Sequence, residues 1–253
     1  MSDSKSIKKI TKIRLDAMLI LRRLAESERH AQALIMAGEI RVNGKRAVKH
    51  GEMFAADAKI EIAHERRKYA SRAGLKLEGA LDDFGVDVEG LTCLDIGAST
   101  GGFTDCLLRH GARRVYAADV NTAQLDWKLQ RDTRVVAIRK NARYMKPTDI
   151  PEAVDLVTID VSFISVSKLI SAAARLAKPG GSFLILIKPQ FELPKRLVCK
   201  GGVVRDPALH ERTISFVRDA VERADLEIIG VKPSRLAGAE GNREFFLHAQ
   251  RIR

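Results

Sequence analysis

The stretch CLDIGASTGGFTD, residues 93–105, joins a short apolar segment to an acid and three glycines. Asp95 stands near the end of a predicted strand, Gly97 follows it, and Gly101 and Gly102 open a predicted helix. Because glycine has no Cβ and a helix N-terminus has unpaired N–H groups, a ligand can approach the backbone closely there. The stretch therefore predicts a strand, a turn and a helix, with a ligand at the turn.

The turn differs from the common phosphate-binding loops. It has neither the Gly-Lys-Ser/Thr ending of a P-loop nor the Gly-x-Gly-x-x-Gly spacing of a dinucleotide site. An acid directly before the glycines would repel a pyrophosphate, but it suits an amino-acid ammonium group or a polar cofactor. A second acid, Asp119, ends the next predicted strand, where it could bind ribose hydroxyls or cap a helix. Asp95, the glycines and Asp119 together indicate S-adenosylmethionine as the cofactor.

From Lys76 onward, apolar segments of strand length alternate with helical segments. The predicted strands are TCLDIG, RVYAAD, RVVAI, DLVTIDVS, SFLILIKP, EIIGVKPS and EFFLHAQ, and the predicted helices are TDCLLRHG, VSKLISAAARLAKPGG and LHERTISFVRDAVERADL. Such alternation predicts an α/β fold, a parallel sheet covered on both faces, with ligands at the carboxyl ends of the strands.

The first part of the chain has a different pattern. RLDAMLILRRLAESERHAQALIMAGEIRVNG, residues 14–44, predicts two short helices followed by a strand. Ser27 is the expected N-cap of the second helix, which Gly38 ends, and Asn43-Gly44 predicts the tight turn of a hairpin. These elements predict a small α+β domain.

The boundary between the two parts is predicted from composition. HERRKYASRAG, which begins at His64, is charged and has no apolar pattern. We therefore expect a first domain over residues 1–63, a linker over residues 64–72 and a second domain over residues 73–253.

The chain is basic, with a formal net charge of +12, and the excess is uneven. Residues 1–72 hold 17 Lys and Arg against 9 Asp and Glu, although they make up less than a third of the 253 residues. A concentrated positive charge predicts a polyanionic partner, RNA or DNA; a basic surface without a partner is the alternative.

Several classes of protein are not expected from this composition. No stretch approaches 18 uncharged apolar residues, as a membrane span requires, and the N-terminus has no apolar core of a secretory signal. The three cysteines are scattered, so they predict neither a disulfide framework nor a zinc site. A reducing cytoplasm is the expected compartment, and no metal ion is expected.

Two charged residues are predicted at the carboxyl ends of strands. Asp160 ends the strand in VTIDVSF and Lys188 ends the strand in ILIKPQFE, so both should face the same crevice. Burying an ammonium is costly unless it is paired, which makes Asp160 its natural partner; a purely structural pair is the alternative. In a site, the lysine could orient a hydroxyl, accept its proton and stabilise the developing oxyanion.

Other methyl acceptors are disfavoured by absent motifs. The loop after the fourth strand reads DVSF, without the Asn/Asp-Pro-Pro-aromatic sequence of enzymes that methylate amino groups of bases. Cys199 lies beyond the fifth strand without a Pro-Cys context, so it does not match the nucleophile of enzymes that methylate carbon 5 of cytosine. A hydroxyl is therefore the expected acceptor.

The chain resembles the TlyA family of ribosomal RNA 2′-O-methyltransferases, some members of which are known as haemolysins. Residues 14–50 are similar to an S4 RNA-binding domain, and residues 73 to about 250 to an FtsJ-type methyltransferase domain. The most specific matches are DIGASTGGFTDCLLRHGA, DVSFIS, KPQFE and GNREFF. The resemblance implies a small N-terminal α+β S4-like domain and a Rossmann-like, S-adenosylmethionine-dependent methyltransferase sheet.

Enzymes of the FtsJ type use a Lys-Asp-Lys-Glu tetrad, which the matching motifs place on Lys76, Asp160, Lys188 and Glu244. The resemblance implies that Lys188 activates the ribose 2′-hydroxyl with Asp160 as its partner. It also implies that Lys76 and Glu244 position the nucleotide and tune Lys188.

Two sets of binding residues follow from the same resemblance. The implied cofactor contacts are Asp95, Gly97, Ser99, Gly101, Gly102, Phe103, Asp119, Asn141, Arg143 and Asp160. For Arg143, contact with an RNA phosphate is the alternative. The implied RNA contacts, which would position the RNA without reading its sequence, are Arg14, Arg22, Arg23, Arg29, Lys45, Arg46 and Lys49.

The expected function is therefore S-adenosylmethionine-dependent methylation of ribose 2′-hydroxyls, on cytidine of the large-subunit ribosomal RNA, with small-subunit RNA as a second target. The expected partners are ribosomal RNA or ribosomal subunits, with no membrane and no obligate protein partner. Two alternatives stay open: a non-catalytic RNA-binding ribosome assembly factor and a haemolysin-like membrane-active protein.

Overall fold

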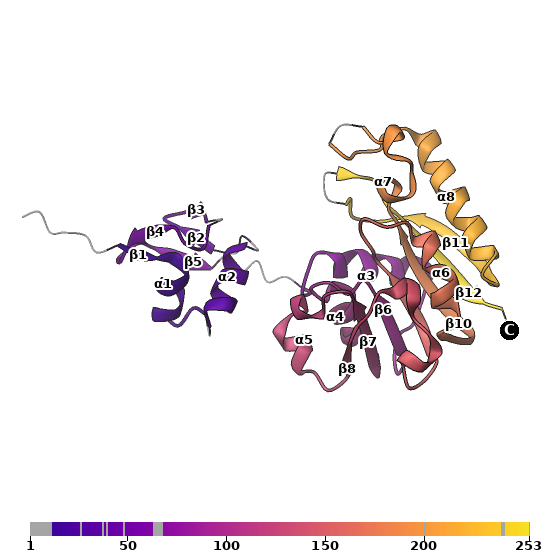
Figure 1. Cartoon of the computed structure of the whole chain (residues 1–253), viewed down its shortest axis with the longest axis horizontal. Helices are drawn as coiled ribbons and strands as arrows, with labels where there is room; N and C mark the ends of the chain where they lie inside the picture. Colours follow the sequence, from indigo (N-terminus) through magenta and orange to yellow (C-terminus); the bar gives the residue numbers. More distant parts are fainter. Residues whose placement is uncertain are drawn as a thin grey trace, which may run out of the picture. The chain divides into compact units, whose positions relative to one another are not determined.

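The computed structural model describes residues 12–25, 27–36, 38, 40–47, 49–62, 68–199, 201–238 and 241–252. The chain divides into two compact units, Met1–Arg66 and Arg67–Arg253, each with its own hydrophobic core (Figure 1).

The first unit combines two helices with short antiparallel strands. Its described elements are β1 (Lys12–Arg14), α1 (Leu15–Leu21), α2 (Glu28–Met36), β2 (Ile40–Val42), β3 (Lys45–Arg46), β4 (Met53–Ala55) and β5 (Ile60–Ile62). The strands form the sheets β1–β4 and β3–β2–β5. The apolar sides of α1 and α2 supply Leu15, Leu19 and Ile35 to the core.

The turn chemistry of this unit follows the sequence. Ser27 Oγ accepts the backbone N–H of His30 at 3.2 Å, as expected for the N-cap of α2. Asn43 and Gly44 both have positive φ, 50° and 77°, which is the geometry of a tight hairpin turn between β2 and β3. The predicted α+β arrangement is confirmed.

The second unit is a seven-stranded sheet covered by helices. Its strands are β6 (Thr92–Ile96), β7 (Arg114–Asp119), β8 (Val135–Arg139), β9 (Val154–Ile159), β10 (Ala177–Ile187), β11 (Leu226–Pro233) and β12 (Phe245–Arg251). Its α-helices are α3 (Ala73–Phe84), α4 (Gly102–Arg109), α5 (Trp127–Arg131), α6 (Ile170–Ala174), α7 (Pro189–Glu192) and α8 (Pro207–Glu222). The short 3₁₀ turns are η1 (Thr122–Gln124), η2 (Ala142–Tyr144), η3 (Pro147–Asp149), η4 (Val166–Lys168) and η5 (Lys195–Leu197).

The strand order is β11-β12-β10-β9-β6-β7-β8. The prediction of a wholly parallel sheet is wrong at one strand, because β12 runs antiparallel to both of its neighbours, β10 and β11. The described residues between β11 and β12, 234–238 and 241–244, form no crossover helix, and strands joined without one are antiparallel neighbours. The Rossmann-like α/β class is confirmed.

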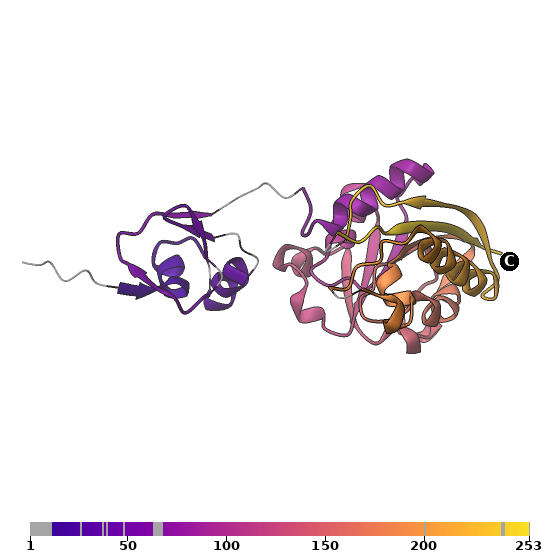
Figure 2. The ribbon, with the colours of Figure 1, turned by 90° about the horizontal axis from the view of Figure 1, so that it is seen from above.

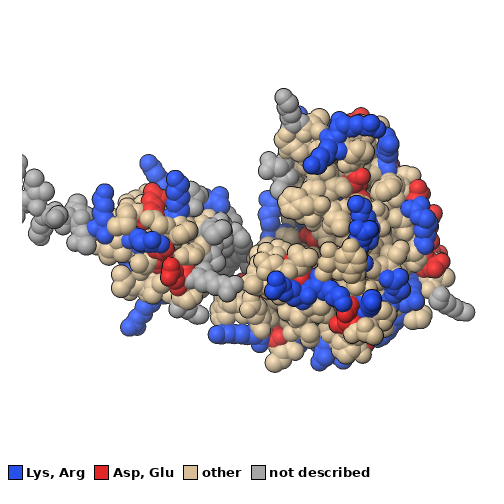
Figure 3. Space-filling model, in the orientation of Figure 1, with Lys and Arg blue, Asp and Glu red and all other residues tan. Residues whose placement is uncertain are grey.

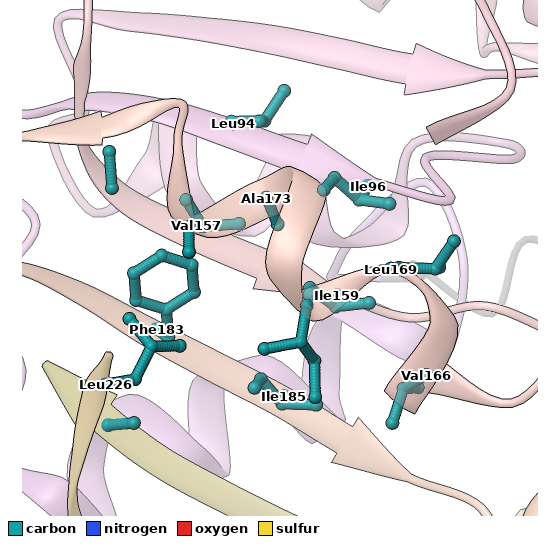
Figure 4. Close-up of a cluster of buried hydrophobic side chains, with 14 of the residues drawn as sticks. Leu94, Ile96, Val157, Ile159, Val166, Leu169, Ala173, Phe183, Ile185 and Leu226 are labelled. Atoms are coloured by element: carbon teal, nitrogen blue, oxygen red, sulfur yellow. The ribbon is translucent and has the colours of Figure 1, made fainter. Parts of the chain in front are cut away.

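Helices lie on both faces of the sheet, as the view from above shows for α3 and α8 (Figure 2). Alternate strand residues point to opposite faces, so Leu94 and Val157 pack in the cluster that includes α6 and α8 (Figure 4). Cys93 and Leu156 pack in the cluster that includes α3 and α4. With both faces covered, the carboxyl edge of the sheet is left for a ligand.

Candidate active site

A pocket of about 140 Å³ lies at the carboxyl ends of β6, β9 and β10. Its walls come from the glycine turn after β6, the residues after β9 and β10, and the segment before α3. The lining residues are Ser71, Ala73, Gly97, Ala98, Ser99, Thr100, Gly102, Phe103, Asp160, Ser162 and Lys188. Six residues predicted from the sequence are among them: Gly97, Ser99, Gly102, Phe103, Asp160 and Lys188.

Gly97 brings the glycine turn against the end of β9. Its φ is +85°, and a Cβ at this position would lie 2.2 Å from the carbonyl oxygen of Asp160. Both the backbone conformation and the missing side chain are therefore required. The absence of a side chain here lets the turn and Asp160 form one continuous wall.

Lys188 and Asp160 form an ion pair in the pocket. Lys188 Nζ lies 2.5 Å from Asp160 Oδ1, and both side chains are largely buried. The same ammonium donates a hydrogen bond of 3.1 Å to Ser162 Oγ. Among the described residues, Asp160 Oδ1 accepts no hydrogen bond, so its contact with Lys188 is an ion pair, and the ammonium keeps donors for a substrate group.

Lys76 and Glu244 form a second buried ion pair, with Nζ 2.5 Å from Oε2. Lys76 comes from α3, and Glu244 precedes β12 directly. In the antiparallel register of β10 and β12, Ile187 is paired with Phe245. Lys188 follows Ile187 and Glu244 precedes Phe245, so the two pairs meet at the same edge of the sheet.

Asp95 is placed behind the pocket and does not line it. Its side chain is fully buried and accepts hydrogen bonds from Thr104 Oγ1 at 2.7 Å and Thr158 Oγ1 at 3.2 Å. Burial raises the pKa of Asp95 to about 7, with a further upward contribution from the charge of Asp160, against the two threonine hydrogen bonds. Its described contacts join β6, β9 and α4.

Asp119 supports the glycine turn from the next strand. Its Oδ2 accepts the backbone N–H of Ser99 at 3.0 Å, and its Oδ1 accepts that of Asn121 at 2.9 Å. The carboxylate thus organises two loops at the carboxyl edge, including the glycine turn. The N-cap of η1 is Asn121, so Asp119 is not itself that cap.

Three further predicted cofactor residues lie outside the pocket lining. Gly101 has φ +93°, and a Cβ there would meet Leu129 at 2.2 Å, so this glycine allows α5 to pack on the turn. Asn141 caps η2 by accepting the backbone N–H of Arg143 at 3.0 Å. Arg143 is exposed, with its guanidinium over the Tyr144 ring.

Phe163 is a functional candidate that sequence reasoning missed. It is 92% exposed, it has φ +68°, and it lies three residues after Asp160. A bulky residue with positive φ is strained, and such strain is concentrated at functional sites. Its ring lies 5.3 Å from that of Phe191, so an aromatic surface flanks the Lys188–Asp160 pair. The aromatic residue in DVSF was the available signal.

Ser71 and Ala73 were also missed, because the predicted linker includes the first and ends just before the second. Residues 63–67 lie outside the described residues, whereas residues 68–72 belong to the second unit, and Tyr69 and Ala70 pack in its core. Tyr69 is buried beside Gly74, and the backbone N–H of Ala70 donates to Asp105 at 2.8 Å. This anchoring holds Ser71 at the pocket wall.

The residues predicted to contact RNA lie in the first unit, and two of them also make contacts within the protein. Arg14 is paired with Asp16 at 2.6 Å, and Arg22 donates to the carbonyls of Ala58 and Ala56 at 2.8 and 2.6 Å. Those two guanidinium groups therefore also hold the fold together. All six described cations of the set are exposed: Arg14, Arg22, Arg23, Lys45, Arg46 and Lys49. The Arg29 side chain lies outside the described part of the chain.

Other features of the described residues lie away from this site. A larger cavity of about 450 Å³ at the opposite end of the sheet, lined in part by Asp155, Ser182 and His248, contains none of the predicted site residues. Cys93 and Cys106 are buried and Cys199 is exposed, and all three are free thiols. Within the ranges that the structure describes, every helix is too short or too polar to cross a bilayer.

Known families match both units. The FtsJ-like methyltransferase family matches residues 69–251, and the S4 domain matches residues 13–51. The 16S/23S rRNA (cytidine-2′-O)-methyltransferase TlyA of Mycobacterium tuberculosis is 43% identical over 236 residues, which cover 92% of this chain and 88% of that protein.

Solved structures agree with these matches. A Streptococcus thermophilus protein described as a hemolysin has a TM-score of 0.73 and 38% identity, covering 96% of this chain and 90% of its own. An S-adenosylmethionine dependent methyltransferase from Mesorhizobium loti has a TM-score of 0.54 and 17% identity, covering 72% of this chain and 100% of its own. The second likeness shows the fold alone.

Proposed function

Because the chain belongs to the TlyA family of FtsJ-like methyltransferases, we propose that it transfers a methyl group to ribose 2′-hydroxyls of ribosomal RNA. The observation that carries this proposal is the pair formed by Lys188 and Asp160 in the wall of the pocket. The Lys76–Glu244 pair at the same edge of the sheet supports it. Two buried ion pairs beside a glycine-lined pocket favour an enzyme over a non-catalytic assembly factor.

We propose S-adenosylmethionine as the cofactor, bound along the glycine turn. The residues fit this group, since Gly97 and Gly102 leave bare backbone on the pocket wall. Ser99, whose N–H is held by Asp119, continues the wall. When bound, the cofactor supplies an electrophilic methyl group on a sulfonium.

Lys188 is the residue proposed to act on the ribose. Its ammonium, held by Asp160 and Ser162, donates a hydrogen bond to the 2′-oxygen and orients one lone pair toward the methyl group. The same charge would stabilise the negative charge that develops on this oxygen while the hydroxyl proton passes to solvent water. Lys76 and Glu244 are proposed to position the nucleotide beside Lys188.

Phe163 is proposed as the surface on which the base of the target nucleotide rests. A ribose inside an RNA helix is difficult to reach in line with the methyl group, so local opening of the RNA is expected. An exposed aromatic ring beside the reacting residues would stabilise the displaced base by stacking.

The first unit is proposed to dock on structured RNA through its exposed cations. Cytidine of the large-subunit RNA is the proposed target, and small-subunit RNA is the second candidate, since the M. tuberculosis relative is named for both. The proposed compartment is the cytoplasm, where ribosomal RNA is found.

The test is tritiated methyl transfer from S-adenosylmethionine to isolated 30S and 50S subunits that lack the modification. Label in an alkali-resistant linkage, which marks a methylated ribose, is the expected result, and the labelled subunit identifies the target. Label on a base, or no label on either subunit with intact cofactor binding, would overturn the proposal.

A further inference from the structure

Two arginines, Arg205 and Arg243, are exposed on loops of the second unit. Arg243 directly precedes Glu244, and Arg205 lies just before α8. Among the described residues, neither has an ion-pair partner. The acid next to Arg205 is engaged elsewhere, because Asp206 accepts the backbone N–H of Ala208 at the start of α8. Both guanidinium groups are therefore available to bind a negatively charged partner outside the chain.

Buried polar groups hold these two arginines on neighbouring loops. Asn242, which is 2% exposed, accepts the N–H of Val204 at 2.9 Å and donates to the carbonyl of Gly202 at 2.8 Å. One arginine follows Val204 and the other follows Asn242 in the sequence. The backbones that carry the two cations are thus joined by side-chain hydrogen bonds.

His210 of α8 contacts the segments that carry both arginines. Its Nε2 lies 3.0 Å from the carbonyl oxygen of Val204, and its ring packs on that of Phe245 at 5.5 Å. The guanidinium of Arg243 lies over the same Phe245 ring, 5.4 Å from its centre. Both arginines are therefore anchored to one buried framework and are not independent surface charges.

This framework lies at the same edge of the sheet as the candidate active site. Arg243 directly precedes Glu244, which lies opposite Lys188 across the paired ends of β10 and β12. The space-filling view shows Lys and Arg side chains gathered over the end of the unit that carries α7 and the adjoining loops (Figure 3).

We propose that Arg205 and Arg243 form a binding site for phosphate groups of the RNA backbone beside the target ribose. The proposal rests on the proposed function. In RNA, the carbon that bears the 2′-hydroxyl is bonded to the carbon that bears the 3′-phosphate ester. A 2′-hydroxyl placed at Lys188 therefore brings backbone phosphates to the edge of the pocket, where guanidinium groups bind them well.

The test compares Arg205→Ala, Arg243→Ala and the double variant with the wild-type chain. We expect KM for the RNA substrate to rise roughly fivefold to tenfold for each single change, with a larger rise for the double. The slope of log affinity against log salt should fall by about 0.7 to 1 for each arginine lost. Affinity for S-adenosylmethionine, measured by calorimetry, should not change.

The matched control is Arg218→Ala, which removes an exposed arginine from α8 in the same unit without a described ion-pair partner. Arg243→Lys should keep most of the salt slope, because it keeps the charge. Salt slopes and KM values equal to those of the control would overturn the proposal. A fall in kcat without a rise in KM would also overturn it, since that result would mean that the substitution disturbs the neighbouring Glu244 and not RNA binding.

The two proposals can fail separately. If the wild-type chain methylates ribose and the arginine variants behave like the control, only the phosphate site is wrong. If the wild-type chain methylates no RNA, the proposed function is wrong, and the salt slopes of RNA binding still test the arginines. Melting curves of each variant verify that the fold is intact.

Discussion

Lys76 and Glu244 are 168 positions apart in the sequence, yet Nζ and Oε2 lie 2.5 Å apart with both side chains buried. Removing one partner leaves an unpaired buried charge. We therefore expect Lys76→Met to lower the free energy of unfolding by about 3 to 5 kcal/mol. Denaturant unfolding measures this effect.

The double variant Lys76→Met/Glu244→Gln separates stability from function. It removes both charges, so most of the lost stability should return, whereas methyl transfer should stay low if the pair positions the nucleotide. A double variant as unstable as the single one would contradict this account of the pair.

Lys188→Ala should lower kcat for methyl transfer by about 100-fold or more, because it removes the group that orients and polarises the hydroxyl. Affinities for RNA and cofactor should change little. The control is Lys178→Ala, at the opposite end of β10 from Lys188, which breaks an ion pair between Lys178 and Asp155 of β9. Equal loss of RNA binding and transfer would count against a chemical role for Lys188.

Phe163→Ala should leave the fold nearly unchanged, within about 1 kcal/mol, because the ring is exposed. If the ring supports the target base, kcat/KM should fall roughly tenfold, in line with the loss of one stacked base. Phe216→Ala, at an exposed aromatic position on α8, is the control and should not affect activity. Unchanged kcat/KM for Phe163→Ala would exclude the stacking role.

Asp95 should make stability depend on pH. Its pKa is raised to about 7 in the folded chain, so the folded state binds more protons than the unfolded state between about pH 4 and pH 7. The contribution of this group to stability is complete below about pH 4 and is lost as the pH rises through 7. The loss amounts to at most about 4 kcal/mol at pH 8.

Asp95→Asn removes this titration while keeping groups that can bond Thr104 and Thr158. Relative to the wild-type chain without cofactor, the variant should gain about 3 kcal/mol in unfolding free energy between pH 5 and pH 8. Denaturant unfolding at both pH values provides the comparison. A difference between the two proteins that does not vary with pH would show that Asp95 does not titrate in this range.

Much of the fold was predictable because local chemistry agrees with it. The alternation of apolar, strand-length segments with helical segments predicts the strand RVYAAD (β7). The residue pair Asn43-Gly44 by itself predicts the hairpin turn. The antiparallel β12 was not predictable, since a strand pattern carries no direction. That direction decides the site, because only this register sets Glu244 opposite Lys188.

By itself, the sequence determined the strand–turn–helix around Gly97, the α/β class and the placement of Asp160 and Lys188 at strand ends. These depend on periodicity and on glycine, which act over a few residues. Only the tertiary structure decided that Lys76 pairs with Glu244, that Asp95 lies behind the pocket, and that Phe163 is exposed while Tyr69 is buried. The reason is physical: burial and pairing arise between segments far apart in the chain, whose contacts no local pattern specifies.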